Sequence, residues 1–409
     1  MPADLRDRLR AALNQPSRVA PFPRAASVTE NEDLAGLGGR WFDSPEGPGY
    51  VIESVYDAGH AHGSVVLHRA LSLDMARIAP QARDERLAAC DPSGLLYVDT
   101  ETTGLGGAGA MVFLAGVARF EGATLHLRQY LLPSPAFERG LLGGLAGELG
   151  TAGALVSYNG KSFDLPMLEA RYILSRARPT FRQLPHLDLL HPNRRLFKGA
   201  VESHRLPNIE RELLGFERED DCPSAEVPER YFRFARTSDP THILPVLRHN
   251  AWDILSLVAL TAHLGAACDV EQFPLQASRA AGYAGDLESV VRFAEATLAS
   301  SPGRAARIET IERAARACRR LGRNQEAAEW WRRAIDEPRA RRLTPYIELS
   351  KLYEHRLHDP AAALNTIETA ISLVQRGILP QGNPTSEATL AALQRRRDRL
   401  EVRATHRSP

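Results

Sequence analysis

Short apolar runs that end in acidic or turn residues recur along the middle of the chain and predict buried strands. They lie at residues 95–102, 111–122, 123–132, 153–160 and 186–190. Helical periodicity lies between them, at residues 137–149 and 162–174, and again in a long apolar segment from about residue 245 to 264. Strands that first form a hairpin and then alternate with helices predict an α/β unit, with a mixed sheet that has helices on both faces.

Two further regions flank this α/β pattern. Residues 1–89 contain strand-like pieces at 47–57 and 62–71 and are expected to form an N-terminal extension packed on the next domain. After residue 275 the strand pattern ends, and similar helical segments begin at Gly285, Gly322 and His358, at intervals of 37 and 36 residues. This period is typical of tetratricopeptide-like repeats, and a plain helical bundle with chance spacing is the alternative. We therefore expect an α/β domain at residues 90–270 and an all-α helical-repeat domain at residues 275–409.

The composition is that of a soluble globular protein and excludes several other classes. Hydrophobic residues make up 44% and charged residues 25% of the 409 residues, which excludes a mainly disordered or collagen-like chain. The four cysteines lie far apart without a CxxC pair, so we expect neither a disulfide scaffold nor a thiolate zinc site, and a reducing, cytoplasmic location. No segment reaches the roughly 18 uncharged apolar residues of a membrane span, so we expect no membrane contact.

Charge changes this picture only locally. The chain has 51 basic and 50 acidic residues and a net charge of +1, which excludes a basic surface over the whole chain. The predicted repeat domain holds the excess of basic residues, with a cluster at Arg395, Arg396, Arg397 and Arg399. A solvated helix face is the usual meaning of such a run, and a contact with a phosphate backbone is the alternative.

Four acidic residues at the ends of predicted elements carry the candidate chemistry. Asp99 and Glu101 lie two residues apart at the end of a predicted strand, so their side chains share a face. Asp164 falls in the first turn of the helix predicted at 162–174. Asp253 lies in the long apolar helix, with His249 one turn earlier on the same face. Carboxylates gathered in an apolar setting are costly to ionise, and a divalent cation offsets that cost.

Each of these residues also has a plainer explanation. Asp99 and Glu101 could face solvent at a strand end, and Asp164 could simply be stabilised by the helix dipole. His249 and Asp253 could form a buried pair that satisfies only itself. Taken together, four carboxylates can hold two divalent ions about 3.5–4 Å apart, the arrangement that clamps the attacking and leaving oxygens in phosphodiester cleavage. His249 could then deprotonate the attacking water.

The order of these motifs resembles the DEDD superfamily, the DnaQ-like 3′–5′ exonucleases with a ribonuclease-H-like fold. The resemblance rests on Asp-x-Glu-Thr-Thr-Gly-Leu at residues 99–105, on Asn159 with Asp164, and on the helix that carries His249 and Asp253. Further stretches are similar to the YprB-type ribonuclease-H-like branch, which often carries tetratricopeptide-like repeats. They lie at residues 186–197, 203–220, 222–234 and 248–257.

The resemblance implies that residues 90–270 form a ribonuclease-H-like exonuclease domain, a metal-dependent nuclease that acts on DNA or RNA by a two-metal mechanism. Asp99, Glu101, Asp164 and Asp253 would bind two Mg²⁺ or Mn²⁺ ions, and His249 would be the general base. The best-known forms of the family have Tyr four residues, or His five residues, before the last Asp. Here His249 stands four residues before Asp253.

Three further polar residues are expected near the substrate. Thr102 follows the first motif, at a stretch that approaches the substrate terminus in related exonucleases, and a turn hydroxyl bonded to the backbone is the alternative. Asn159 and Lys161 lie in the turn before Asp164, at the same rim.

Two other functions remain open beside the 3′–5′ exonuclease. One is a catalytically weak or inactive scaffold that binds nucleic acid or a protein partner through the helical repeats. The other is a structure-specific endonuclease that uses the same metals. In each case we expect nucleic acid as a partner, and a protein partner through the repeats.

Overall fold

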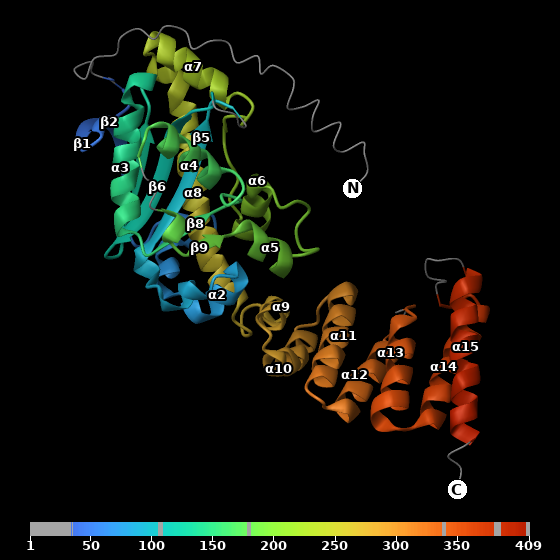
Figure 1. The fold of residues 1–409 in the computed structure, drawn as a ribbon. Helices are drawn as coiled ribbons and strands as arrows, with labels where there is room; N and C mark the ends of the chain where they lie inside the picture. Colours follow the sequence, from blue (N-terminus) through green and yellow to red (C-terminus); the bar gives the residue numbers. More distant parts are fainter. Residues whose placement is uncertain are drawn as a thin grey trace. The chain divides into compact units, whose positions relative to one another are not determined.

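The computed structural model of the chain (Figure 1) describes residues 34, 36–104, 109–177, 181–337, 341–379 and 386–405. The chain divides into two compact units. Unit 1 contains the residues up to 194 together with residues 199–263, and unit 2 contains residues 195–198 together with those from 264 onward. The first 33 residues of the predicted N-terminal extension lie outside the described part.

A seven-stranded sheet in the order β1-β2-β7-β6-β5-β8-β9 forms the centre of unit 1. Its strands are β1 (Arg40–Ser44), β2 (Gly47–Tyr56), β5 (Leu95–Thr102), β6 (Val112–Glu121), β7 (Thr124–Leu131), β8 (Ala154–Ser157) and β9 (His186–Asp188). Neighbours pair antiparallel from β1 through β2, β7 and β6 to β5, whereas β5–β8 and β8–β9 pair parallel. The predicted mixed sheet flanked by helices is therefore confirmed.

The segment predicted as an N-terminal extension supplies two strands of this sheet, because β2 pairs with β7 and β1 pairs with β2. The strand-like piece predicted at residues 62–71 is different in the structure. It contains the second residue of β3 (Ala61–His62), then β4 (Val65–Val66), and mostly a 3₁₀ helix at Leu67–Ser72. The helix α2 (Met75–Ala82) follows. The domain boundaries themselves stay a prediction.

Alternation along β5 separates the hydrophobic core from the acidic residues. Successive side chains of a strand point to opposite faces. Leu96 and Val98 join a core cluster with Leu142 of α3 (Glu138–Thr151) and Leu168 of α4 (Asp164–Leu174). Asp99 and Glu101 therefore point to the other face, which α8 (Pro240–Ala267) covers (Figure 1).

The helix α8 is longer than the sequence pattern indicates, with 28 residues from Pro240. It begins about five residues earlier because Asp239 Oδ1 accepts a hydrogen bond from the Thr241 N–H at 2.9 Å, a local contact that periodicity does not report. By length and composition alone this helix could cross a membrane, but 72% of its apolar window is buried inside the structure. Its apolar character is thus explained by packing against the sheet.

The helix α8 approaches the sheet closely at Gly116 of β6, which lies opposite Asp99 of β5. A Cβ atom on Gly116 would lie 2.2 Å from Asn250 Oδ1. The same oxygen accepts a hydrogen bond from Gln129 Nε2 at 2.9 Å, and that nitrogen also donates to the Leu247 carbonyl at 2.8 Å. The glycine therefore allows the Asn250 amide to lie flat on the sheet, between β7 and Asp99.

Unit 2 is rich in helices, as predicted. Its helices are α9 (Pro274–Ala284), α10 (Leu287–Ala299), α11 (Arg304–Arg320), α12 (Asn324–Asp336), α13 (Thr344–Leu352), α14 (Pro360–Gln375) and α15 (Ser386–Thr405). Each helix contacts the next along the chain. The starts of α10, α12 and α14 keep the intervals of 37 and 36 residues seen in the sequence. The tetratricopeptide-like character of the repeats stays a prediction.

Part of the basic cluster of α15 is engaged within unit 2. Glu354, whose side chain is 1% exposed, pairs with Arg396 at 3.1 Å, Arg399 at 3.0 Å and Arg403 at 2.6 Å. These arginines therefore attach the last described helix to a buried carboxylate, so they do not simply form a solvated face.

We expect Gly116→Ala to lower the free energy of unfolding by about 1–3 kcal/mol, because the added methyl group displaces Asn250 from its place on the sheet. Thermal or urea unfolding measures the change. The matched control is Gly147→Ala in α3, where an added Cβ meets nothing within 4 Å. It should raise stability by roughly 0.5–1 kcal/mol, since Ala favours a helix interior over Gly. Wild-type stability of Gly116→Ala would contradict the role given to this glycine.

Candidate active site

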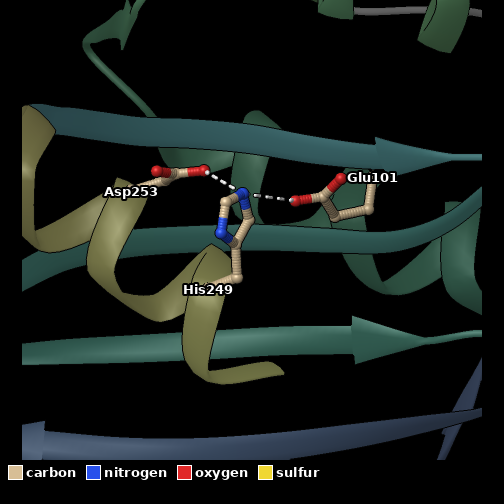
Figure 2. Close-up of side chains that lie close together, drawn as sticks. All are labelled: Glu101, His249 and Asp253. Atoms are coloured by element: carbon tan, nitrogen blue, oxygen red, sulfur yellow. Dashed lines mark ion pairs between the residues drawn. The ribbon is translucent and has the colours of Figure 1, made fainter. Parts of the chain in front are cut away.

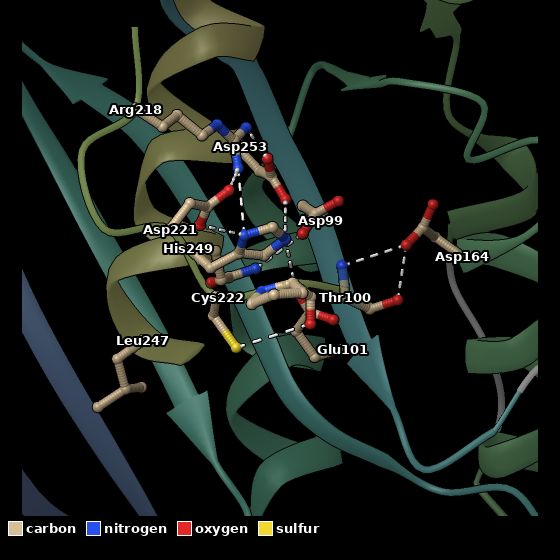
Figure 3. Close-up of polar contacts among 12 residues, drawn as sticks. Asp99, Thr100, Glu101, Asp164, Arg218, Asp221, Cys222, Leu247, His249 and Asp253 are labelled. Atoms are coloured by element: carbon tan, nitrogen blue, oxygen red, sulfur yellow. Dashed lines mark hydrogen bonds and ion pairs between the residues drawn. The ribbon is translucent and has the colours of Figure 1, made fainter. Parts of the chain in front are cut away.

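Side chains from three elements come together at the carboxyl end of β5 (Figure 3). Asp99 and Glu101 belong to β5, and His249 and Asp253 belong to α8. These four lie close together, and Asp164, the first residue of α4, lies beside the same strand, where Thr100 of β5 contacts it. The negative charge of Asp164 reaches both Asp99 and Glu101 and helps to raise their pKa values, as does that of Asp253, so the four predicted acids share one electrostatic environment.

The tightest group is formed by Glu101, His249 and Asp253, which offer one ligand atom each within 4.8 Å of one another (Figure 2). His249 Nε2 lies 3.8 Å from Glu101 Oε1 and 3.5 Å from Asp253 Oδ2. Their side chains are between 9% and 15% exposed, so solvent reaches them only in part. Carboxylate oxygens are the donors that Mg²⁺ and Mn²⁺ prefer, whereas an imidazole nitrogen suits later first-row metal ions. This donor set therefore fits a divalent cation.

The carboxylates on β5 are held in a state that disfavours their negative charge. Burial, followed by the charges of Asp253, Asp164 and Glu101, raises the pKa of Asp99 well above its usual value. Burial and the charges of Asp253 and Asp164 do the same to the pKa of Glu101. Asn250 Nδ2 opposes this effect by donating a hydrogen bond to Asp99 Oδ2 at 2.8 Å. A bound cation would remove the remaining cost of ionisation.

Asp164 is tied to β5 by Thr100. The backbone N–H and the hydroxyl of Thr100 donate to Asp164 Oδ1 at 3.1 and 2.6 Å. Burial raises the pKa of Asp164, and these two hydrogen bonds lower it in part. Thr100 lies between Asp99 and Glu101 on β5, and its side chain points away from theirs. Its two hydrogen bonds therefore hold the start of α4 at a fixed distance from these acids.

His249 is oriented by two residues of the segment before α8. Its Nδ1 lies 2.7 Å from Asp221 Oδ1 and 3.2 Å from Arg218 Nη1. The shorter contact favours a proton on Nδ1 that is donated to Asp221. The Nε2 lone pair then faces Glu101 and Asp253. In this orientation the imidazole can accept a proton or bind a cation at Nε2.

The three residues predicted to contact substrate have local contacts in the turns that carry them. The Thr102 hydroxyl donates to the Gly104 carbonyl at 2.9 Å, which is the turn contact left open as the alternative. The backbone N–H groups of Asn159 and Lys161 donate to the two oxygens of Asp188 at 2.7 and 3.1 Å. Asp188 therefore holds the turn in shape, and the Lys161 side chain is exposed at its rim.

A cavity of about 730 Å³ opens beside these residues, with Thr100, Thr102 and Asp164 in its wall. Its remaining lining is mainly apolar and includes three large side chains that are more than half exposed, Phe163, Ile173 and Leu174. Exposed apolar groups gathered beside a polar site are typical of a surface that receives a ligand.

Sequence reasoning missed four residues of this site, Thr100, Arg218, Asp221 and Asn250. Arg218 and Asp221 belong to the run EREDD at 217–221, which has the composition of a solvated turn. The Arg218 side chain is only 5% exposed. The only indication of a role for Asn250 in the sequence is its place directly after His249. Nothing in the sequence relates it to Asp99.

We expect the variant Asp99→Asn to gain stability relative to the wild type as the pH rises from 5 to 8 in EDTA. The pKa of Asp99 is raised in the folded protein, so the folded state holds a proton that the unfolded state releases near pH 4. The contribution of this carboxyl to the free energy of unfolding is fully present below about pH 4. It is lost as the pH rises through the folded pKa, at about 1.4 kcal/mol per pH unit. Unfolding curves at four pH values measure the difference. A stability difference that does not change with pH would exclude the buried, charge-repelled state of Asp99.

Comparison with known proteins agrees with this geometry. Residues 96–265 match the model of the RNase_H superfamily, a range that runs from β5 to α8 and contains all five residues of the group. Over 292 residues, 68% of the chain, the sequence is 32% identical to the uncharacterized protein YprB of Bacillus subtilis (strain 168), of which 70% is covered. The chain therefore belongs to the family of the YprB protein, and its residues 96–265 form a domain of the RNase_H superfamily.

Proposed function

We propose that the protein is a metal-dependent nuclease that hydrolyses phosphodiester bonds of DNA or RNA, and that it acts as a 3′–5′ exonuclease of the DEDD type. The observation that carries the proposal is the gathering of Glu101 and Asp253 around His249, with burial and mutual repulsion raising the pKa of both β5 acids, Asp99 and Glu101. Strongly perturbed carboxyls are typical of catalytic sites, and Asp164, whose pKa is also raised, lines the cavity. Domains of the RNase_H superfamily are usually nucleases, which supports the same reaction class.

Two Mg²⁺ or Mn²⁺ ions fit the four acids best, because these ions prefer carboxylate oxygens. Asp99, Glu101, Asp164 and Asp253 would hold them. When bound, such ions lower the pKa of water and stabilise negative charge on the attacking and leaving oxygens of a phosphodiester.

His249 is proposed as the general base. Its Nε2 accepts the proton of the attacking water, and the resulting imidazolium is stabilised by Asp221 at Nδ1. Burial alone would raise the pKa of Asp221. The hydrogen bond to His249 and the charge of Arg218 outweigh burial and hold this pKa below its usual value, which suits Asp221 to the task. The carboxylate is therefore ionised at neutral pH.

The cavity beside Asp164 is proposed to take the terminal nucleotide. Phe163 offers an exposed ring on which a base can stack, and base stacking is tolerant of sequence. Thr102 lines this cavity, and Asn159 and Lys161 come just before its lining residues Ser162 and Asp164 in the chain. The Lys161 ammonium is proposed to meet a phosphate. An apolar site for one base next to the acids suits cleavage at a strand end.

We further propose that the helices of unit 2 form tetratricopeptide-like repeats that bind a protein partner or guide the nucleic acid. The regular intervals of α10, α12 and α14 support the repeats. The spread of the cysteines supports action in the cytoplasm.

Purified protein should release mononucleotides from end-labelled DNA or RNA oligonucleotides when Mg²⁺ or Mn²⁺ is added. Asp99→Asn and Asp253→Asn should each lose at least about 100-fold in rate, because each removes a proposed metal ligand while keeping the size of the side chain. Glu219→Gln, an exposed acid in the same unit, is the control and should keep the wild-type rate. If both Asn variants match the wild type, the assignment of the acids is wrong.

The substrate form separates the rival functions in the same assay. A circular single strand offers no end, so the exonuclease should leave it intact, and its cleavage would favour an endonuclease. Binding of oligonucleotides without hydrolysis, under every divalent metal, would favour the scaffold.

His249→Gln should lower kcat by roughly 100-fold or more and leave Mn²⁺ affinity unchanged, since a general base contributes to the proton transfer and not to ion binding. Calorimetric titration with Mn²⁺ measures the affinity, and single-turnover kinetics measures the rate. His242→Gln, on an earlier turn of α8 and 30% exposed, is the control. A tenfold loss of Mn²⁺ affinity in His249→Gln would instead make this imidazole a ligand.

A further inference from the structure

A further set of charged contacts, which the proposed reaction does not explain, meets Asp253 and Asp221 (Figure 3). Its centre is Arg218. Nη2 of this guanidinium donates to Asp253 Oδ1, and Nη1 donates to Asp221 Oδ2 at 3.2 Å. Nε and Nη2 donate to the two oxygens of Glu210 at 2.7 and 2.6 Å. One planar cation thus connects three carboxylates, and a rigid fork can do this only in one orientation.

The far side of this group is fully buried. Glu210, in the π-helical turn Glu210–Leu214, is 0% exposed. Its Oε1 also accepts a hydrogen bond from Ser256 Oγ at 2.5 Å, and His62 Nε2 lies 2.7 Å from that same hydroxyl. A continuous series of polar contacts therefore runs from β3, through α8 and Glu210, to Arg218 and Asp253. Buried networks of this kind fix the positions of their members.

The segment that carries Arg218 is also held by contacts that involve no carboxylate. Gly215, with φ 64°, ends the π-helical turn and redirects the chain. The Phe216 ring centre then lies 3.8 Å from that of His62 and 5.9 Å from that of Trp252. Arg248 Nη2 donates to the Asp220 carbonyl at 2.5 Å. The position of Arg218 over α8 is thus set by the fold around it.

From this geometry we propose that Arg218 is a positioning residue that holds Asp253 for the divalent cation. It occupies Oδ1 of Asp253, so Oδ2 is the oxygen that faces His249 and the Glu101 side. The inference rests on the proposed function, because it takes Asp253 to be a metal ligand. Arg218 itself touches neither substrate nor reacting atoms.

A purely electrostatic role for Arg218 predicts the opposite effect on metal binding. A positive charge beside the acids repels a divalent cation, so its removal would strengthen Mn²⁺ binding. If Arg218 acts by positioning, its removal frees the Asp253 carboxylate to rotate, and Mn²⁺ binding weakens. The sign of the change in Mn²⁺ affinity therefore separates the two roles.

The test is calorimetric titration of the full chain with Mn²⁺ alone. Arg218→Lys keeps the charge but cannot bridge Glu210 and Asp253 as a fork, and we expect Mn²⁺ affinity to fall about 10- to 100-fold. The double variant Glu210→Gln with Arg218→Met removes the cation together with its buried counter-charge, so it avoids an unpaired buried carboxylate. It should show the same loss. Arg230→Lys, whose pair with Glu226 lies on the surface of α7 (Val227–Thr237), is the control.

A second readout excludes a merely structural effect. At saturating Mn²⁺ the kcat of Arg218→Lys should return to within a few-fold of the wild type, because excess ion compensates for a misplaced ligand, whereas a damaged fold would not recover. Circular dichroism confirms that each variant is folded. Unchanged or tighter Mn²⁺ binding in both variants would overturn the proposal. A wild type that binds Mn²⁺ without cleaving nucleic acid would overturn the nuclease function but not the role of Arg218, and a wild type without Mn²⁺ binding would overturn both.

Discussion

Crowding of negative charge at the carboxyl end of one buried strand is the constraint on which the rest of unit 1 depends. Asp99 and Glu101 share a face of β5 because the strand alternates, and Leu96 and Val98 fill the core on its other face. Ionised acids in such a place repel each other and lack solvent. Neighbouring side chains offset this cost with hydrogen bonds to the carboxylates. The Asn250 amide donates to Asp99, Thr100 donates to Asp164, and Arg218 donates to Asp253.

Each of these donors requires its own supporting neighbour, so the site extends well beyond the acids. Asn250 lies on the sheet because Gly116 has no side chain, and Gln129 fixes the orientation of its amide. Arg218 is held by Glu210, which is held in turn by Ser256. The chemistry that we propose therefore depends on side chains from β3 to α8, and not on the motifs alone.

The acids and their elements could be predicted from the sequence, because apolar runs that end in acids report strands locally. The predicted mixed sheet is confirmed by the structure. Arg218 and Asp221 could not be predicted, because a run of five charged residues has the pattern of a solvated turn. Contacts with residues distant in the chain hold it inward, among them those of Phe216 with His62 and Trp252. The pairing of β2 was missed for a related reason, since its partner β7 begins almost 70 residues later in the chain.

The place of β1 and β2 in the sheet has a consequence for any shorter form of this protein. The match to the superfamily begins at residue 96, and a fragment cut there would lack both strands and the β3 hairpin. The outer edge of β7 would then present its backbone N–H and C=O groups without partners, from Leu125 to Leu131. Open edges of this length invite other chains to pair with them, so such a fragment would tend to self-associate while still carrying every acid of the site.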